Sequence, residues 1–263
     1  MDAFLTSLAF LTRIPVPQRS NSFDSTTFSR SIIFFPLAGL IIGLVNGGLY
    51  LLLGKVLPIH VLAVITIMVP IFMSGGMHFD GLLDTCDGIF SGRSREKSLE
   101  IMRDSRVGSM GVIAGILDVL LRYTLLLSLP GEILPLLLIT QPVAGRWVIS
   151  VALHLFPYAR KEGGLGQGFN QHKNVANIIL STGLTLLIIY ALSGFNGLVV
   201  VGLAGVASLL IALWASYRLG GLTGDVYGAL NEAAEIMFIL LWLAASQNLD
   251  LGLYGPLSCW GRF

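Results

Sequence analysis

Three aspartates stand close together in the segment GGMHFDGLLDTCDG, residues 75–88. Asp80, Asp84 and Asp87 are spaced so that a helix would place them on one face about 60° wide. Carboxylates on one face repel one another, and protons, arginines or a bound cation must offset that repulsion. Because oxygen ligands suit a hard cation that also bridges phosphates, the spacing predicts a Mg²⁺ site. The alternative interpretation is a solvated acidic loop or helix end.

Basic residues follow in the segment MRDSRVGSMG, residues 102–111. Arg103 and Arg106 would lie on one side of a helix, where together they could clamp a phosphate. Asp104 between them could pair with either arginine, and it is also a candidate metal ligand. The same arginines could instead anchor the next apolar segment at the lipid headgroups.

A third polar segment, residues 218–235, leads into an apolar run. It carries Asp225, Asn231, Glu232 and Glu235. Carboxylates at a helix start interact favourably with the helix dipole, which explains part of this pattern. Capping does not readily explain four polar groups that enter an apolar helix, so the segment is a further source of candidate site residues.

Other polar residues lie in or beside apolar runs. His78 could pair with a carboxylate or a phosphate, although a histidine at a membrane interface is more often simply hydrogen-bonded. Asp118 and Arg122 are expected to form a structural ion pair, and Arg146 either lines a cavity or contacts substrate. The glycine-rich segment 156–170 would suit a loop over an anionic ligand, or an ordinary polar loop.

The elements that position these residues are expected to be membrane-spanning helices. The chain has 263 residues, 54% hydrophobic and 12% charged, whereas soluble domains carry about 25% charged residues. We predict an all-α fold, a single integral membrane domain over residues 1–263 built as a transmembrane bundle of about seven spans. A short amphipathic helix over residues 2–12 could lie in the interface. The expected spans are residues 31–53, 61–77, 110–129, 133–156, 175–193, 197–217 and 231–247.

The charges of the connections predict the orientation. Polar loops near residues 78–108, 157–174 and 218–230, together with the amino-terminal segment, carry about twelve of the sixteen lysines and arginines. Since basic loops stay in the cytoplasm, we expect a cytoplasmic amino terminus, and a site that faces the cytoplasm. A net charge of +1 gives no global attraction to nucleic acid. Cys86 and Cys259 match no metal or redox spacing.

Several segments, taken in order, resemble the cobalamin synthase family, adenosylcobinamide-GDP ribazoletransferase. The resemblance covers nearly the whole chain. Cys86 and Met110 depart from the small residue and the aromatic residue expected there, and neither departure removes a charged group. The matching segments are TRIPVP at residues 12–17, GGMHFDGLLDTCDG at 75–88, MRDSRVGSMG at 102–111, PYARKEGGLG at 157–166 and GGLTGDVYGALNE at 220–232.

The resemblance implies transfer of a phosphorylated cobinamide group from adenosylcobinamide-GDP to α-ribazole or α-ribazole 5′-phosphate, with release of GMP and dependence on Mg²⁺. It implies a multi-pass protein of a bacterial or archaeal cell membrane, the inner membrane in a Gram-negative cell. A homo-oligomer is left open. The predicted metal ligands are Asp80, Asp84, Asp87 and Asp104. The predicted substrate-binding residues are His78, Arg103, Arg106, Arg146 and Asn231, and the candidate general bases are Asp87, Asp225 and Glu232.

Two other classes of protein remain as alternatives. The carboxylate pattern also resembles that of the CDP-alcohol phosphotransferases, but the D-G-x-x-A-R segment expected there is missing. An ion-coupled transporter is the alternative from a different class, because charges near membrane helices also mark ion pathways. The charges gather at one interface instead of the midplane and no inverted repeat is evident, and both observations argue against transport.

Overall fold

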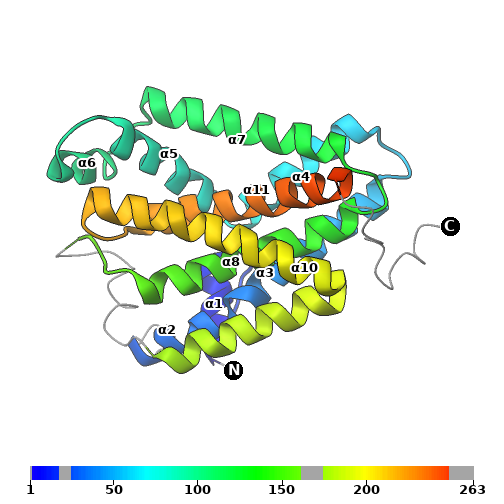
Figure 1. The fold of residues 1–263 in the computed structure, drawn as a ribbon, viewed down its shortest axis with the longest axis horizontal. Helices are drawn as coiled ribbons and strands as arrows, with labels where there is room; N and C mark the ends of the chain where they lie inside the picture. The colour runs from blue at the N-terminus through cyan, green and yellow to red at the C-terminus, as the bar shows by residue number, and fades with distance from the viewer. Residues whose placement is uncertain (1, 18–24, 161–173, 249–263) are drawn as a thin grey trace.

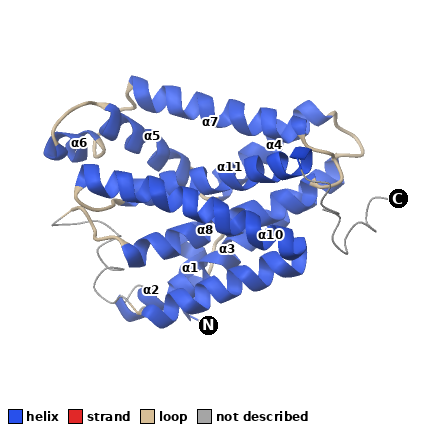
Figure 2. Ribbon diagram, in the orientation of Figure 1, coloured by secondary structure: helices blue, strands red, loops and turns tan. Residues whose placement is uncertain are grey.

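The computed structural model describes residues 2–17, 25–160 and 174–248, which form helices without any strand (Figures 1 and 2). An isolated bridge pairs Tyr158 with Leu222. In chain order the elements are α1 (Asp2–Leu11), α2 (Ser25–Ser31), the 3₁₀-helix η1 (Ile32–Phe34), α3 (Phe35–Leu53), α4 (Ile59–Met73), α5 (Met77–Phe90), α6 (Arg95–Ile101), α7 (Ser109–Ser128), α8 (Leu134–Leu155), α10 (Val175–Leu219) and α11 (Gly224–Asn248).

Five helical segments in the described residues are long and apolar enough to cross a membrane. They are Thr26–Leu53, which runs through α3, then α7, α8, α10, and Gly224–Ser246 within α11. Helices α4 and α5 make a sixth if the pair counts as one span broken by a 90° bend. The prediction of a polytopic helical membrane bundle is therefore confirmed.

Helix α10 accounts for two of the expected spans. Its 45 residues would extend for about 67 Å at 1.5 Å per residue, more than twice the ~30 Å hydrocarbon layer. Gly194 interrupts it with φ 63° and ψ −159°. Figure 1 shows the two arms running in opposite directions from this break. The arms correspond to the spans expected at residues 175–193 and 197–217, so about seven spans were expected where five or six helical units are seen.

Helices α3 and α8 pack at very short range because α3 presents a row of glycines. Gly39, Gly43 and Gly47 recur at every fourth residue and face the α8 backbone. A Cβ on Gly43 would lie 2.8 Å from the Cα of Ile139, and one on Gly39 would lie 2.9 Å from the Cα of Val143. Membrane helices gain stability from such close approach, since lipid supplies little hydrophobic force between them.

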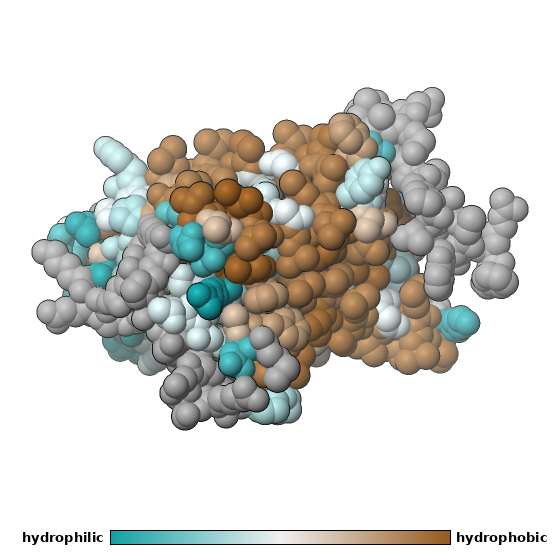
Figure 3. Space-filling model, turned by 90° about the horizontal axis from the view of Figure 1, so that it is seen from below, coloured by the Kyte–Doolittle hydropathy of each residue, from teal (hydrophilic) through white to brown (hydrophobic). Residues whose placement is uncertain are grey.

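Burial differs strongly between the helices. In α8, 78% of the apolar stretch is buried, against 33% in α7 and 39% in α10. Helix α8 is therefore the centre of the bundle, and the outer faces of α7 and α10 are left for lipid. Figure 3 shows apolar residues over most of the visible surface, with hydrophilic residues gathered mainly at one end. Helix α6, the start of α7 and the turn from α10 to α11 lie at that end in Figure 1.

Two segments that were expected to be loops are helical. Residues 77–90 form α5, and residues 224–230 form the first turns of α11. Gly81, Gly88 and Gly228 of these segments lie where helices touch. The expected loop at 157–174 lies largely outside the described residues. The expected amino-terminal helix over residues 2–12 is confirmed as α1.

Candidate active site

Helix α5, which carries the three aspartates, begins at a sharp break in the chain. Gly75 and Gly76 adopt φ of 66° and 76°, a conformation that only glycine takes without strain. They turn α5 by 90° from α4. The backbone N–H of Arg13 donates to the carbonyl of Met73 at 2.7 Å, and the Arg13 side chain fills the space where Gly75 lacks a Cβ. The segment after α1 therefore packs on the bend that orients α5.

Helices α5 and α11 are in close backbone contact, which brings their carboxylates together. A Cβ on Gly81 would lie 2.6 Å from the carbonyl oxygen of Asp225, and one on Gly228 would lie 3.0 Å from that of His78. Asp84 consequently lies within electrostatic range of Asp80, Asp87 and Asp225, and of Arg160. The sequence prediction that Asp80, Asp84 and Asp87 share one helical face agrees with this arrangement. Asp225 joins them from another helix.

Asp225 is held by two donors on one of its oxygens. Arg160 Nη2 donates to Oδ2 at 2.8 Å, and Thr223 Oγ1 donates to the same atom at 3.2 Å. No described residue donates to Oδ1. The chain near Arg160 is fixed because Ala159 N–H donates to the carbonyl of Leu222 at 2.9 Å. As far as the described residues go, Oδ1 of Asp225 therefore has no donor and can accept a proton.

Tyr158 lies close to Asp225 and Arg160, and Arg103 lies close to Tyr158. Partial burial raises the pKa of the Tyr158 hydroxyl above its usual value of 10.0; Asp225 adds to the rise, and Arg160 and Arg103 oppose it. Tyr158 therefore stays protonated at neutral pH and can act as a hydrogen-bond donor. Arg103 is exposed, so its charge is available to an anionic ligand near Tyr158.

Asp87 has a structural task that its spacing did not reveal. Its Oδ2 accepts the backbone N–H of Gly108 at 2.6 Å, and its Oδ1 accepts that of Gly111 at 2.8 Å. A carboxylate at this position satisfies backbone donors that the first turn of α7 leaves without helical partners, and it interacts favourably with the helix dipole. Both oxygens are engaged, so Asp87 is the least available of the three aspartates. Its predicted metal and catalytic roles stay predictions.

Asp104 and Arg106 pair with each other on the surface. Arg106 donates from Nη2 to Asp104 Oδ2 at 2.7 Å and from Nε to Oδ1 at 3.0 Å. The hydrogen bonds from Arg106 lower the pKa of Asp104 to about 2. A phosphate that binds Arg106 must therefore compete with the Asp104 carboxylate.

A second polar cluster is buried between the helices. Arg122 on α7 donates from Nε to Asp118 at 2.9 Å, which confirms the expected ion pair. It also donates from Nη1 to Glu235 at 3.0 Å and from Nη2 to Glu232 at 2.6 Å, both on α11. The Arg122 side chain is 5% exposed. Sequence reasoning placed Glu232 at the substrate, and it missed these pairings because they join distant parts of the chain.

The cluster extends to α8 and α5. Arg146 Nη1 donates to Glu235 Oε1, and Arg146 Nη2 lies 3.2 Å from His78 Nδ1. The side-chain amide of Asn231 donates to Glu232 and to Glu235, each at 3.1 Å. These residues fix the helices that carry the more accessible Asp80 and Asp84. Their predicted contact with substrate stays a prediction.

The donor set suits Mg²⁺ in chemical type. Within the described residues, no three His, Cys, Asp or Glu side chains are placed to enclose one metal ion. Mg²⁺ usually keeps several waters and binds through one or two carboxylates together with substrate phosphates. Asp80, which is exposed, and Asp84, which is partly buried, provide such a pair one helical turn apart.

The fold and this site define an integral membrane protein with carboxylates and arginines gathered at one end of its helices. The sequence model of cobalamin-5-phosphate synthase matches residues 3–243. A chain from Desulfitobacterium hafniense, named adenosylcobinamide-GDP ribazoletransferase, is 39% identical over 242 residues, which cover 89% of this chain and 93% of that protein. Chains of the same name from Clostridium novyi and Escherichia coli are each 37% identical, over 93% and 91% of this chain and 97% and 98% of theirs. No solved structure matches.

The chain therefore belongs to the cobalamin-5-phosphate synthase family. Membership makes it a transferase of cobalamin biosynthesis, and it confirms the resemblance that the sequence motifs indicated.

Proposed function

We propose that the chain joins adenosylcobinamide-GDP to α-ribazole, or to α-ribazole 5′-phosphate, giving adenosylcobalamin, or its 5′-phosphate, and GMP. The observation that supports this most directly is the convergence of Asp80, Asp84 and Asp225 with Arg160 and Arg103 at the polar end of a membrane bundle. The reaction takes place on a diphosphate, and such a site offers both metal-binding oxygens and phosphate-binding guanidinium groups.

In the proposed reaction, a ribose hydroxyl oxygen attacks the phosphorus bonded to the cobinamide side chain. A new P–O bond forms, the P–O bond to GMP breaks, and the hydroxyl proton passes to a base. Positioning and neutralisation of phosphoryl charge supply most of the catalysis in such displacements. Asp80 and Asp84 would hold Mg²⁺, which neutralises diphosphate charge when bound. Arg103 would contact the phosphates directly.

Among the three candidate bases, Asp225 is the best placed to accept the hydroxyl proton. Its Oδ1 accepts no hydrogen bond from the described residues, while Arg160 and Thr223 hold Oδ2. Asp87 has both oxygens occupied by backbone donors. Glu232 is only 7% exposed and is paired with Arg122. A base must reach the proton that it removes, and Asp225 meets that condition with the least rearrangement.

We place the site on the cytoplasmic side of the cell membrane, the inner membrane in a Gram-negative cell. Supporting this, α6, the start of α7 and the end of α10 lie at the polar end of the bundle, and basic segments stay in the cytoplasm. These elements and the turns beside them carry Arg93, Arg95, Arg103, Arg106 and Arg218.

The test is GMP release by detergent-purified protein given adenosylcobinamide-GDP and α-ribazole, with and without Mg²⁺. We expect metal-dependent release by the wild type and a loss of at least a hundredfold in Asp84→Asn. Glu100→Gln is the matched control, because it removes an exposed carboxylate at the same end that pairs only with Lys97 among the described residues. Size-exclusion profiles verify that each variant is folded.

Absence of GMP release from folded wild-type protein would contradict the proposed function. CDP-alcohol substrates would then be assayed, followed by solute transport.

A further inference from the structure

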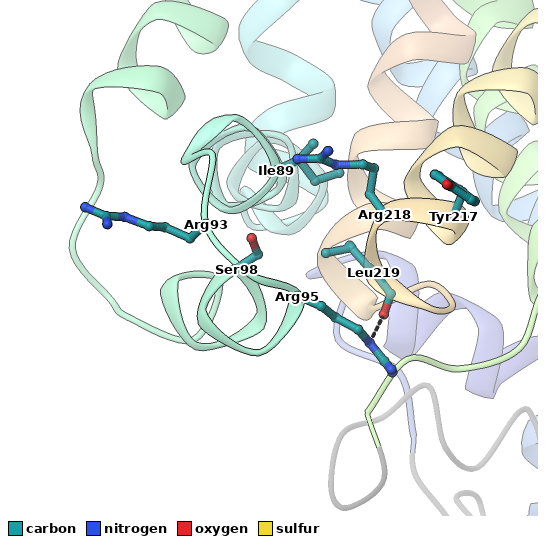
Figure 4. Close-up of a pocket in the computed structure, with 7 residues that line it drawn as sticks. All are labelled: Ile89, Arg93, Arg95, Ser98, Tyr217, Arg218 and Leu219. Carbon is teal, nitrogen blue, oxygen red and sulfur yellow. Dashed lines mark hydrogen bonds between the residues drawn. The ribbon is translucent and has the colours of Figure 1, made fainter.

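A cavity of about 280 Å³ lies at the polar end of the bundle, where the end of α5, helix α6 and the end of α10 meet (Figure 4). None of the candidate catalytic, metal or substrate residues lines it. Three of its seven lining residues are arginines, namely Arg93, Arg95 and Arg218, and no carboxylate lines it.

Arg95 forms a fixed wall of this cavity. Its Nε donates to the carbonyl of Leu219 at 2.6 Å and its Nη2 to that of Ala159 at 3.3 Å. Gly220, with φ 70°, leaves room for this side chain, since a Cβ there would lie 2.6 Å from the guanidinium carbon. The guanidinium of Arg95 is thus held by one carbonyl group at the end of α10 and one in the segment after α8. No carboxylate of the described residues pairs with it.

The other two arginines are available to a ligand. Arg93 and Arg218 are exposed, and neither forms an ion pair with a described residue. In Figure 4, Arg218 reaches toward Ile89, Ser98 lies between the arginines, and Arg93 extends outward at the rim. The lining of the cavity thus carries positive charge without a carboxylate from the described residues. Such a lining favours an anion, and guanidinium matches the geometry of phosphate.

Exposed aromatic side chains on α5 and α10, two of the helices that border the cavity, indicate the membrane interface. Phe90 and Trp214, 53% and 44% exposed, have ring centroids 5.8 Å apart. Tyr217, which lines the cavity, is 87% exposed. Tryptophan and tyrosine gather at the level of lipid headgroups. Leu210 and Leu213, which precede Tyr217 in α10, are exposed as well and offer an apolar surface toward the bilayer interior.

We propose that this cavity binds the phosphate headgroup of an anionic phospholipid, with the acyl chains along the exposed face of α10. Basic pockets between membrane helices bind anionic headgroups in this manner. At about 280 Å³, the cavity is slightly smaller than pockets for drug-sized molecules, which measure about 300–1,000 Å³, so its size suits a small headgroup. A soluble phosphate would share the arginines but would gain nothing from the apolar face of α10.

The test is a titration of detergent-purified protein with phosphatidylglycerol or phosphatidylcholine, with bound lipid counted by native mass spectrometry. We expect the wild type to bind phosphatidylglycerol at least tenfold more tightly than phosphatidylcholine. The double substitution Arg93→Gln with Arg218→Gln should weaken phosphatidylglycerol binding about thirtyfold, and Arg218→Gln alone about fivefold. Lys97→Gln is the matched control, because Lys97 is an exposed cation on α6 that does not line the cavity.

Equal affinity for the two lipids, or unchanged binding in the double variant, would overturn the proposal. Competition by inorganic phosphate as effective as that by phosphatidylglycerol would assign the cavity to a soluble phosphate instead. The readout is binding and does not need the transferase reaction, so its failure is distinguishable from failure of the proposed function.

Discussion

Arg122 of α7 and Glu235 of α11, 113 positions apart in the chain, form an ion pair of 3.0 Å in the interior of the bundle. Glu235 is shared, because its second oxygen accepts a hydrogen bond from Arg146 of α8. One carboxylate therefore joins three helices. Removing any one of these partners should destabilise the fold, because a buried charge left without a partner is costly.

Replacing Arg122 with Gln should destabilise the protein strongly. The change leaves Asp118, Glu232 and Glu235 short of a positive charge, and breaking buried pairs of this kind typically costs about 3–5 kcal/mol. Thermal unfolding in detergent would measure the loss. Lys97→Gln, which breaks an exposed pair, should leave the melting temperature nearly unchanged. Equal losses in both variants would show that the buried cluster contributes no special stability.

From the close contact between α3 and α8, we expect different effects when two glycines of α3 are replaced. Gly43→Ala should lower the melting temperature because its Cβ would overlap the backbone of Ile139. Gly48→Ala should be neutral or slightly stabilising, because no other described part of the chain lies within 4 Å of its added Cβ and alanine favours helix by about 1 kcal/mol over glycine. Similar melting temperatures for the two variants would contradict the close packing described for α3.

Asp87 should protect the first turn of α7. Asp87→Ala removes the acceptor for the N–H groups of Gly108 and Gly111, and loss of a cap costs about 1 kcal/mol. Hydrogen exchange followed by mass spectrometry should show faster exchange in peptides that cover residues 108–112. The same peptides should be unchanged in Asp84→Ala. Unchanged exchange in Asp87→Ala would remove the capping role and leave the predicted metal role as the better explanation.

Asp104 should act on substrate binding through Arg106. Since the folded pKa of Asp104 is about 2, below its usual 3.8, the carboxylate stays ionised throughout the neutral range. Any stability that it contributes is present above about pH 4 and is lost as the pH falls through its folded value. Asp104→Asn frees Arg106, so we expect a lower KM for adenosylcobinamide-GDP, an unchanged kcat and an unchanged pH profile from pH 6 to about 9.

The contrary result for Asp104 is equally informative. A large loss of kcat that more Mg²⁺ restores would show that Asp104 is a metal ligand, as the sequence suggested. Arg106→Gln should raise KM in either case if the guanidinium contacts the phosphates.

Much of the fold follows from the apolar runs and their limits. Spans such as residues 110–129 and 133–156 agree closely with α7 and α8, because a run long enough to cross lipid has few other stable forms. The structure of residues 75–90 was harder to predict from the sequence. Glycines there indicate either a loop or close packing, and only the neighbouring backbone of α11 distinguishes the two at Gly81.

The chemical types of the site residues could be predicted from the sequence, but the role of each residue was harder to predict. Asp80 and Asp84 stand out by spacing alone, whereas Asp87 lies on the same predicted face and has a different task. Its partners are the backbone N–H groups of Gly108 and Gly111, more than twenty positions away. A sequence does not indicate which backbone N–H groups need a side-chain acceptor. The role of Asp225 could be recognised only together with its partner Arg160, which lies 65 positions earlier on another segment.

The hydrogen bond between Arg13 and Met73 also bears on the order in which the protein assembles. The ribosome makes α1 and the segment after it first, but their partner on the α4–α5 bend does not exist until α3 and α4 have been inserted. Until then α1 can pack only on the elements that directly follow it, α2, η1 and α3. The bend that directs α5 is therefore completed by a segment made before α3 and α4, and the carboxylates of α5 can take their final positions only after that segment packs on the bend.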